Sequence, residues 1–162
     1  MELHENLSRE VGQLLLKQHQ ILASAESCTG GGVATAITEI AGSSQWFDRA
    51  FVTYSNQAKM EMLGVQQQTL DQYGAVSEQT VVEMVDGALT HSPATIAVAI
   101  SGIAGPGGGS EEKPVGMICF AWADKSGWKS VETHYFSGDR TQVRQQAVYQ
   151  ALIRLHDYLS GE

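Results

Sequence analysis

Hydroxyl, thiol and glycine residues gather in one short stretch, residues 27–32 (SCTGGG), which is the part of the sequence best suited to chemistry. An apolar segment of strand character, residues 20–25, precedes it, and residues 33–37 of helical character follow it. Glycines permit a sharp turn and a close approach of a ligand, and the start of a helix offers free N–H groups. The stretch could therefore carry a hydroxyl nucleophile, an oxyanion site or a phosphate cradle. The alternative is that Ser27 or Thr29 only caps a helix.

Lys59 could act as the general base for such a serine, because a Ser–Lys pair needs no histidine. It follows the strand-like residues 47–54 and falls in the first turns of an expected helix that begins near Ser55. Burial and the positive end of the helix dipole both disfavour the ammonium form, so we expect a lowered pKa for Lys59. The phenol of Tyr54 could share the proton path. The alternative is an exposed lysine, with a tyrosine that covers the sheet edge.

A second glycine-rich loop, residues 101–113, follows the nearly all-apolar residues 95–100, which predict a central strand buried on both faces. Loops at the carboxyl ends of strands hold ligands in open α/β sheets. If the two strands are parallel neighbours, this loop and residues 26–32 face one pocket. The alternative for this loop is a flexible linker.

Motifs for several other chemistries are missing from the sequence. The first loop, residues 26–32, has no Walker-type Gly-Lys-Ser/Thr ending and no dinucleotide fingerprint. The five histidines and two cysteines have no metal-ligand spacing, so we expect no metal and no cofactor. The sequence does not exclude a Ser-His-Asp triad, because the residues of such a triad meet in space and need not be close in sequence.

The composition is that of an acidic globular chain of 162 residues with a formal net charge of -8. This charge argues against broad binding to nucleic acid or to an anionic membrane. We see no secretory signal and no apolar run long enough for a membrane span, and the two cysteines form no pair, so we expect a reduced, cytoplasmic protein. A few local cations could still hold an anionic ligand; Lys113, Arg140 and Arg144 are the candidates, with surface salt bridges as the alternative for the two arginines.

Hydrophobic periodicity predicts helices and strands in alternation along the chain. The expected helices cover about residues 3–19, 28–39, 55–63, 66–72, 77–91 and a last helix capped by Asp139, and the expected hairpin covers 115–123 and 129–136. This order predicts a single α/β domain over residues 1–162, with a mixed sheet and helices packed on its faces.

Five short motifs occur in order along most of the chain: residues 25–31 (AESCTGG), 53–56 (TYSN), 74–77 (GAVS), 101–106 (SGIAGP) and 113–116 (KPVG). Together they closely resemble the CinA C-terminal-domain family. The resemblance implies a three-layer α/β/α domain. The length of the chain is similar to that of the stand-alone form of the family. Nothing in the sequence matches the additional molybdopterin-binding-like domain of the longer CinA proteins. The resemblance to this form implies that the protein hydrolyses nicotinamide mononucleotide to nicotinate mononucleotide and ammonia. This reaction recycles pyridine nucleotide for NAD synthesis.

The resemblance also implies roles for individual residues. Ser27 matches the family's serine nucleophile, and Tyr54 and Lys59 match its partners. The other residues expected to bind substrate or the oxyanion are Thr29, Gly30, Gly31, Asn56, Ser101, Gly102, Ile103, Ala104, Gly105, Lys113, Arg140 and Arg144. The resemblance further implies a homodimer.

Two other functions stay open. A non-catalytic nucleotide-binding module would keep the glycine loops but would need no Ser27–Lys59 pair. A dinucleotide pyrophosphatase would need a divalent metal and clustered carboxylates, for which the loop pair Glu111-Glu112 gives weak support.

Overall fold

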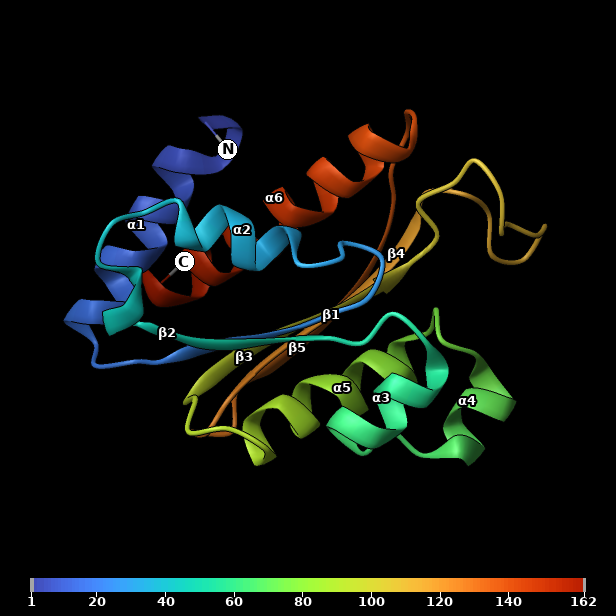
Figure 1. Ribbon diagram of the computed structural model, residues 1–162, viewed down its shortest axis with the longest axis horizontal. Helices are drawn as coiled ribbons and strands as arrows, with labels where there is room; N and C mark the ends of the chain where they lie inside the picture. The colour runs from blue at the N-terminus through green and yellow to red at the C-terminus, as the bar shows by residue number, and fades with distance from the viewer. Residues whose placement is uncertain (1, 162) are drawn as a thin grey trace.

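A five-stranded mixed sheet separates two layers of helices in the computed structural model, which describes residues 2–161 (Figure 1). The strands are β1 (Leu22–Glu26), β2 (Phe47–Val52), β3 (Ile96–Gly102), β4 (Met117–Asp124) and β5 (Lys129–Tyr135). The helices of the described chain are α1 (Glu5–Lys17), α2 (Gly32–Thr38), α3 (Asn56–Leu63), α4 (Gln67–Tyr73), α5 (Glu78–Thr90) and α6 (Arg140–Leu159), with short 3₁₀ turns η1 (Glu2–His4) and η2 (Ser43–Gln45). The expected three-layer α/β/α fold is confirmed.

The strand order β2-β1-β3-β4-β5 places the two glycine-rich loops beside each other. β1 pairs in parallel with both β2 and β3, and Glu26 at its end lies opposite Val52 and Ile100. The three parallel strands therefore end at the same sheet edge. The expectation that residues 26–32 and 101–113 face one another is confirmed. β4 and β5 complete the sheet as the expected antiparallel hairpin.

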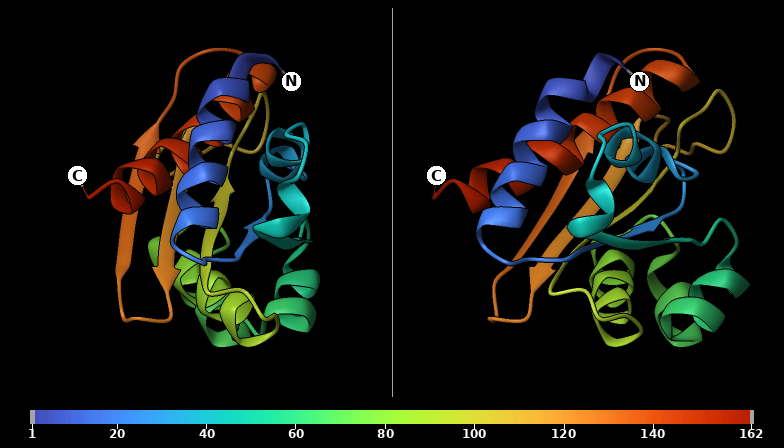
Figure 2. Two further views of the ribbon diagram at one scale, coloured as in Figure 1. Left: turned by 90° about the vertical axis from the view of Figure 1, so that its left-hand side faces the viewer. Right: turned by 60° about the vertical axis from the view of Figure 1, so that its left-hand side comes forward.

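The two faces of the sheet carry different cores. α1, α2 and α6 cover one face, and α3, α4 and α5 lie on the other (Figures 1 and 2). Ile96, Val98 and Ile100 of β3 belong to the first core, whereas Ala97 and Ala99 belong to the second. The strand is therefore buried on both faces, as its apolar run predicted.

Helix caps follow the sequence predictions at three helices. The side chains of Ser55, Ser77 and Asp139 accept hydrogen bonds from the N–H groups of Ala58, Thr80 and Gln142. α2 is the exception, because it begins at Gly32 rather than at residue 28 as predicted. Residues 28–31 form a turn in which Gly30 and Gly31 take positive φ angles of 58° and 95°, a conformation that glycine adopts readily.

The carboxylate of Glu26 explains this turn. Its oxygens accept hydrogen bonds from the N–H groups of Gly31, Val33 and Ala34 at 3.1, 3.0 and 3.0 Å. The hydroxyls of Ser24 and Thr29 donate two more, at 2.9 and 2.7 Å. Glu26 therefore occupies the start of α2, and the alternative that Ser27 or Thr29 caps this helix is wrong.

Burial makes these five hydrogen bonds essential. Glu26 is 0% exposed, so no bulk water solvates its charge, and the donors must replace water. The carboxylate consequently fixes the backbone on both sides of residue 27.

Over residues 2–161, no helix combines the length and apolar character needed to cross a membrane.

We predict that Glu26→Gln lowers the free energy of unfolding by about 3 kcal/mol, because an amide NH₂ would face donors and at least two charge-assisted hydrogen bonds would be lost. Urea titration followed by circular dichroism measures this change. Glu112→Gln, which alters the net charge equally at an exposed loop residue, is the matched control. A loss at Glu26 no larger than that of the control would contradict the role of this carboxylate.

Candidate active site

Ser27 occupies a fixed position immediately after β1. Its N–H donates to the carbonyl of Ile100 at 3.1 Å, and its own carbonyl accepts from the N–H of Gly30 at 3.0 Å. The side chain is 8% exposed and lines a cavity. The strand and the turn thus present the hydroxyl at the carboxyl edge of the sheet, where open α/β sheets bind ligands.

Lys59 reaches this hydroxyl from α3. Its Nζ lies 3.0 Å from Ser27 Oγ and 2.8 Å from the carbonyl oxygen of Thr53. The residue is only 1% exposed, so the alternative of a solvated lysine is wrong. Burial lowers the pKa of Lys59, as the sequence predicted. A neutral amine can donate to Thr53 while its lone pair accepts the proton of Ser27, which is the geometry of a general base.

The cavity around this pair has a volume of about 260 Å³ and joins the two predicted loops. Its lining is drawn from the end of β1, the start of α3, the glycine-rich loop after β3 and the start of α6. The lining residues are Ser27, Cys28, Tyr54, Asn56, Lys59, Ala75, Val76, Ser101, Gly102, Ile103, Ala104, Gly105, Gly107, Gly108 and Arg140. The structure therefore brings most of the expected site residues together, and the glycine-rich loop forms part of a cavity wall.

Tyr54 and Arg140 form the outer part of the cavity. The Tyr54 hydroxyl accepts a hydrogen bond from Arg140 Nη2 at 2.9 Å, and Arg140 Nη1 donates to the carbonyl of Gly105 at 2.7 Å. Tyr54 is 63% exposed, as the alternative of a tyrosine at the sheet edge predicted. Arg140 thus ties the loop after β3 to the segment after β2.

Arg144 and Lys113 lie outside this cavity. Arg144 donates from Nε to the carbonyl of Cys28 and from Nη2 to that of Thr29, both at 3.1 Å. It lines a separate cavity together with Thr29 and Gly30. Lys113 donates to the carbonyl of Tyr73, at the end of α4. The helical spacing of Arg140 and Arg144 put them on one face but did not reveal that they enter different cavities.

Cys28, adjacent to Ser27, is unsuited to act as a nucleophile. It is 7% exposed, and burial raises the pKa of its thiol to about 12. The thiolate is the nucleophilic form of cysteine, so this side chain is inert near neutral pH.

Sequence reasoning missed two residues that support the site. Thr53 donates its N–H to the carbonyl of Glu26 at 2.7 Å and offers its own carbonyl to Lys59. Glu26 itself holds the turn after Ser27. The available signal was a lone carboxylate at the end of an apolar strand, directly before the glycines.

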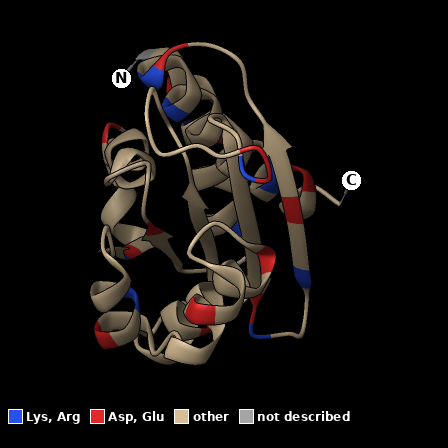
Figure 3. Cartoon of the chain, turned by 90° about the vertical axis from the view of Figure 1, so that its right-hand side faces the viewer, with Lys and Arg blue, Asp and Glu red and all other residues tan. Residues whose placement is uncertain are grey.

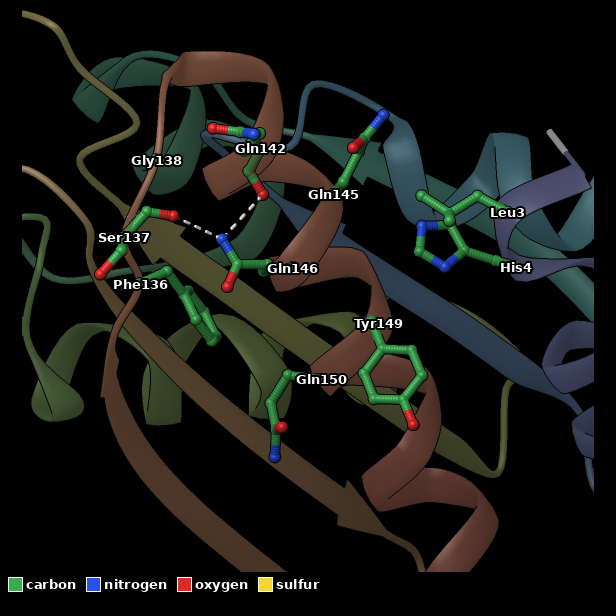
Figure 4. A pocket seen from close by; sticks show the side chains of 10 residues that line it. All are labelled: Leu3, His4, Phe136, Ser137, Gly138, Gln142, Gln145, Gln146, Tyr149 and Gln150. Atoms are coloured by element: carbon green, nitrogen blue, oxygen red, sulfur yellow. Dashed lines mark hydrogen bonds between the residues drawn. The ribbon is translucent and has the colours of Figure 1, made fainter.

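A larger cavity lies away from Ser27. It has a volume of about 760 Å³ and lies against α6, between the end of β5 and the N-terminal 3₁₀ turn (Figure 4). Glutamines dominate its lining, and Gln146 donates to the carbonyls of Ser137 and Gln142. No residue expected at the catalytic site lines it, so size alone does not identify the active site here.

Charged residues form no metal centre in the described chain. Within residues 2–161, no group of three or more His, Cys, Asp or Glu side chains is arranged to hold a metal ion. Glu111 and Glu112 are both exposed. Acidic and basic residues are spread over many elements in the view of Figure 3.

Comparison with known proteins gives one consistent family. The family model described as the CinA C-terminal domain matches residues 4–159. A protein of Escherichia coli strain K12 named nicotinamide-nucleotide amidohydrolase PncC is 58% identical over 146 residues, which cover 90% of this chain and 88% of that protein. A protein of the same name from Enterobacter agglomerans is 55% identical over 160 residues, covering 98% and 97% of the two chains. The crystal structure of competence/damage inducible protein CihA from Agrobacterium tumefaciens has a TM-score of 0.93 at 47% identity, covering 96% of this chain and 94% of that one.

We predict that the Lys59 ammonium loses its proton below the pKa of about 10.4 that is typical of lysine, because the charged form is desolvated. Carbon-13 NMR titration of the lysine Cε signals measures this pKa, and the signal absent from Lys59→Met assigns it. A Lys59 signal that titrates at or above the typical value would show that the charged form is stabilised, and this would contradict the base geometry.

Proposed function

Because this chain belongs to the CinA C-terminal domain family and is an amidohydrolase acting on a linear amide, we propose that it converts nicotinamide mononucleotide and water to nicotinate mononucleotide and ammonia. We further propose that residues 1–162 act as one amidohydrolase domain. The relatives named nicotinamide-nucleotide amidohydrolase support the substrate. The observation that carries the mechanism is the 3.0 Å contact between Lys59 Nζ and Ser27 Oγ within a cavity.

In the first half of the proposed reaction, neutral Lys59 takes the hydroxyl proton as Ser27 Oγ attacks the carboxamide carbon. A bond forms between Oγ and carbon, and the carbonyl electron pair moves onto oxygen. The tetrahedral intermediate then expels the amide nitrogen, which receives the proton from Lys59 and leaves as ammonia. The product of this half is an acyl ester on Ser27.

In the second half, water enters the position that ammonia has left. Lys59 takes a proton from the water as its oxygen attacks the ester carbon. The bond to Oγ breaks, and Lys59 returns the proton to Ser27. Direct contact between Lys59 and Ser27 makes a relay through Tyr54 unnecessary. We propose that Tyr54 instead positions the substrate at the outer part of the cavity, with its hydroxyl held by Arg140.

The hydrogen bonds of the loop N–H groups indicate which of these groups are free to stabilise the oxyanion. The N–H groups of Gly30, Gly31 and Gly32 donate to Ser27, Glu26 and Thr29, and that of Ile103 donates to Met117. Among residues 2–161, no acceptor is seen for the N–H groups of Cys28, Ala104 and Gly105, all of which line the cavity. We propose that the Cys28 N–H and one of the other two stabilise the oxyanion.

The anionic phosphate of the proposed substrate needs a cation, and Arg140 supplies the one guanidinium of the described chain that lines the Ser27 cavity. Asn56 adds an amide at the same wall. Arg140 offers a planar fork suited to phosphate oxygens. Its contacts with Gly105 and Tyr54 hold it in place before substrate binds.

The protein's environment and assembly are further parts of the proposal. We propose a cytoplasmic homodimer, on the family resemblance and the two unpaired cysteines. Size-exclusion chromatography with light scattering measures the assembly directly.

We predict that Ser27→Ala lowers the rate of ammonia release from nicotinamide mononucleotide by at least about 10³-fold, because it removes the nucleophile. Ser43→Ala is the matched control, since Ser43 is also 8% exposed but lies in η2. Both rates are measured with a coupled ammonia assay in the presence of a chelator, and ligand binding is checked by calorimetry.

The outcomes of this assay separate the functions that were open from sequence. Turnover of Ser27→Ala within a few-fold of the parent would exclude Ser27 as nucleophile. Absence of ammonia from the parent protein would favour a binding module, and loss of activity in chelator would favour metal chemistry. Cys28→Ala should retain activity, because a small side chain suffices beside the serine.

A further inference from the structure

A second cavity lies on the other side of the turn that follows Ser27. It has a volume of about 280 Å³ and is bounded by η1, α2, α6 and the turn itself. The lining residues are His4, Thr29, Gly30, Gly32, Thr35, Thr141, Arg144, Gln145 and Val148. None of them lines the Ser27 cavity, so the two cavities are separate.

The polar side chains of this second cavity can all donate a hydrogen bond, and Arg144 can only donate. The described hydrogen bonds of Arg144 use Nε and Nη2, which leaves Nη1 without a partner. Within the described residues, the hydroxyls of Thr35 and Thr141 and the amide of Gln145 also have no hydrogen-bond partner. No carboxylate lines the cavity, although the chain has 18 acidic and 10 basic residues.

His4 lines both this cavity and the cavity of about 760 Å³ described above. It is only 3% exposed, and neither ring nitrogen has a hydrogen-bond partner among the described residues. Figure 4 shows its ring beside Leu3, across α6 from Ser137. Buried polar groups normally have partners, so the ring nitrogens of His4 are available for a hydrogen bond to a molecule in either cavity.

The backbone of α2 does not contribute to this cavity's chemistry, because Glu26 already accepts from the N–H groups of Gly31, Val33 and Ala34. Recognition would instead rest on the Arg144 guanidinium and the neutral side chains around it. A guanidinium with adjacent hydroxyl and amide donors matches a tetrahedral oxyanion. The volume equals about nine water molecules at ~30 Å³ each, enough for a phosphate group with a small substituent.

We propose that this cavity is a binding site for a small oxyanion of the phosphate class, separate from the catalytic cavity. Arg144 forms a charge-assisted hydrogen bond to the anion through Nη1, and Thr35 and Thr141 donate from opposite walls, α2 and α6. Because Arg144 also holds the carbonyls of Cys28 and Thr29, the bound anion is linked to the turn that follows Ser27. This site does not depend on the reaction proposed above.

The test is titration calorimetry with inorganic phosphate at constant ionic strength. We expect saturable binding to the parent protein and at least about tenfold weaker binding to the double variant Thr35→Val/Thr141→Val, which removes two donors at nearly constant shape. Both threonines are exposed, and thermal melts check that the variant folds. Arg140→Gln removes the proposed phosphate cation of the other cavity, so saturable phosphate binding that persists in this variant belongs to the second cavity. Ribose 5-phosphate in a parallel titration distinguishes a phosphate monoester from free phosphate as the preferred ligand.

Three results would overturn the proposal. These are no saturable binding to the parent at tens of millimolar phosphate, equal binding to the double variant, or loss of binding in Arg140→Gln alone. Ammonia release is measured on the same proteins. If the double variant raises KM for nicotinamide mononucleotide by the factor that it weakens phosphate binding, the cavity holds the substrate's own phosphate and the claim of a separate site fails. Turnover without phosphate binding contradicts only this proposal, and phosphate binding without turnover contradicts only the proposed reaction.

Discussion

The geometry of the proposed Ser27–Lys59 pair depends on the hydrogen bonds of the buried Glu26 carboxylate. Its five donors force residues 28–31 into a turn with two left-handed glycines, and this turn sets the position of Ser27. The carbonyl of the same residue accepts the N–H of Thr53, which fixes the end of β2 beside β1. Thr53 in turn offers its carbonyl to Lys59. One buried charge therefore organises both members of the Ser–Lys pair.

Two of the buried ionisable groups, Glu26 and Lys59, have opposite surroundings. The carboxylate of Glu26 accepts hydrogen bonds from backbone and hydroxyl donors, which replace the lost water. Lys59 is buried, and among residues 2–161 its side chain has a carbonyl and a hydroxyl as hydrogen-bond partners but no carboxylate, so its ammonium form is destabilised and its pKa falls. The same burial that makes the lysine costly in its charged form makes it useful as a base. Arg140 and Arg144 then brace the two loops from α6, one on each side of the turn.

Much of this arrangement could be predicted from sequence, because it follows local patterns. Apolar periodicity gave the order of elements, and the all-apolar run at residues 95–100 identified the central strand. The position of Lys59 after a strand, at the start of a helix, predicted a lowered pKa if the side chain were buried, and burial is the cause that the structure shows. The start of α2 was predicted four residues early, because its N–H groups are satisfied by a side chain from β1 rather than by a local cap. Arg140 and Arg144 line different cavities because the turn after Ser27 lies between them. Helical spacing alone gives no information on the position of that turn.

The central claim is that Lys59 acts as a base rather than as a fixed positive charge. The most direct measurement is the rate of ammonia release by Lys59→Arg, with the fold verified by circular dichroism. A guanidinium keeps the charge but does not give up its proton near neutral pH. We expect Lys59→Arg to be as inactive as Lys59→Ala. Substantial activity in Lys59→Arg would contradict the account and would leave Tyr54 or a water molecule as the proton acceptor.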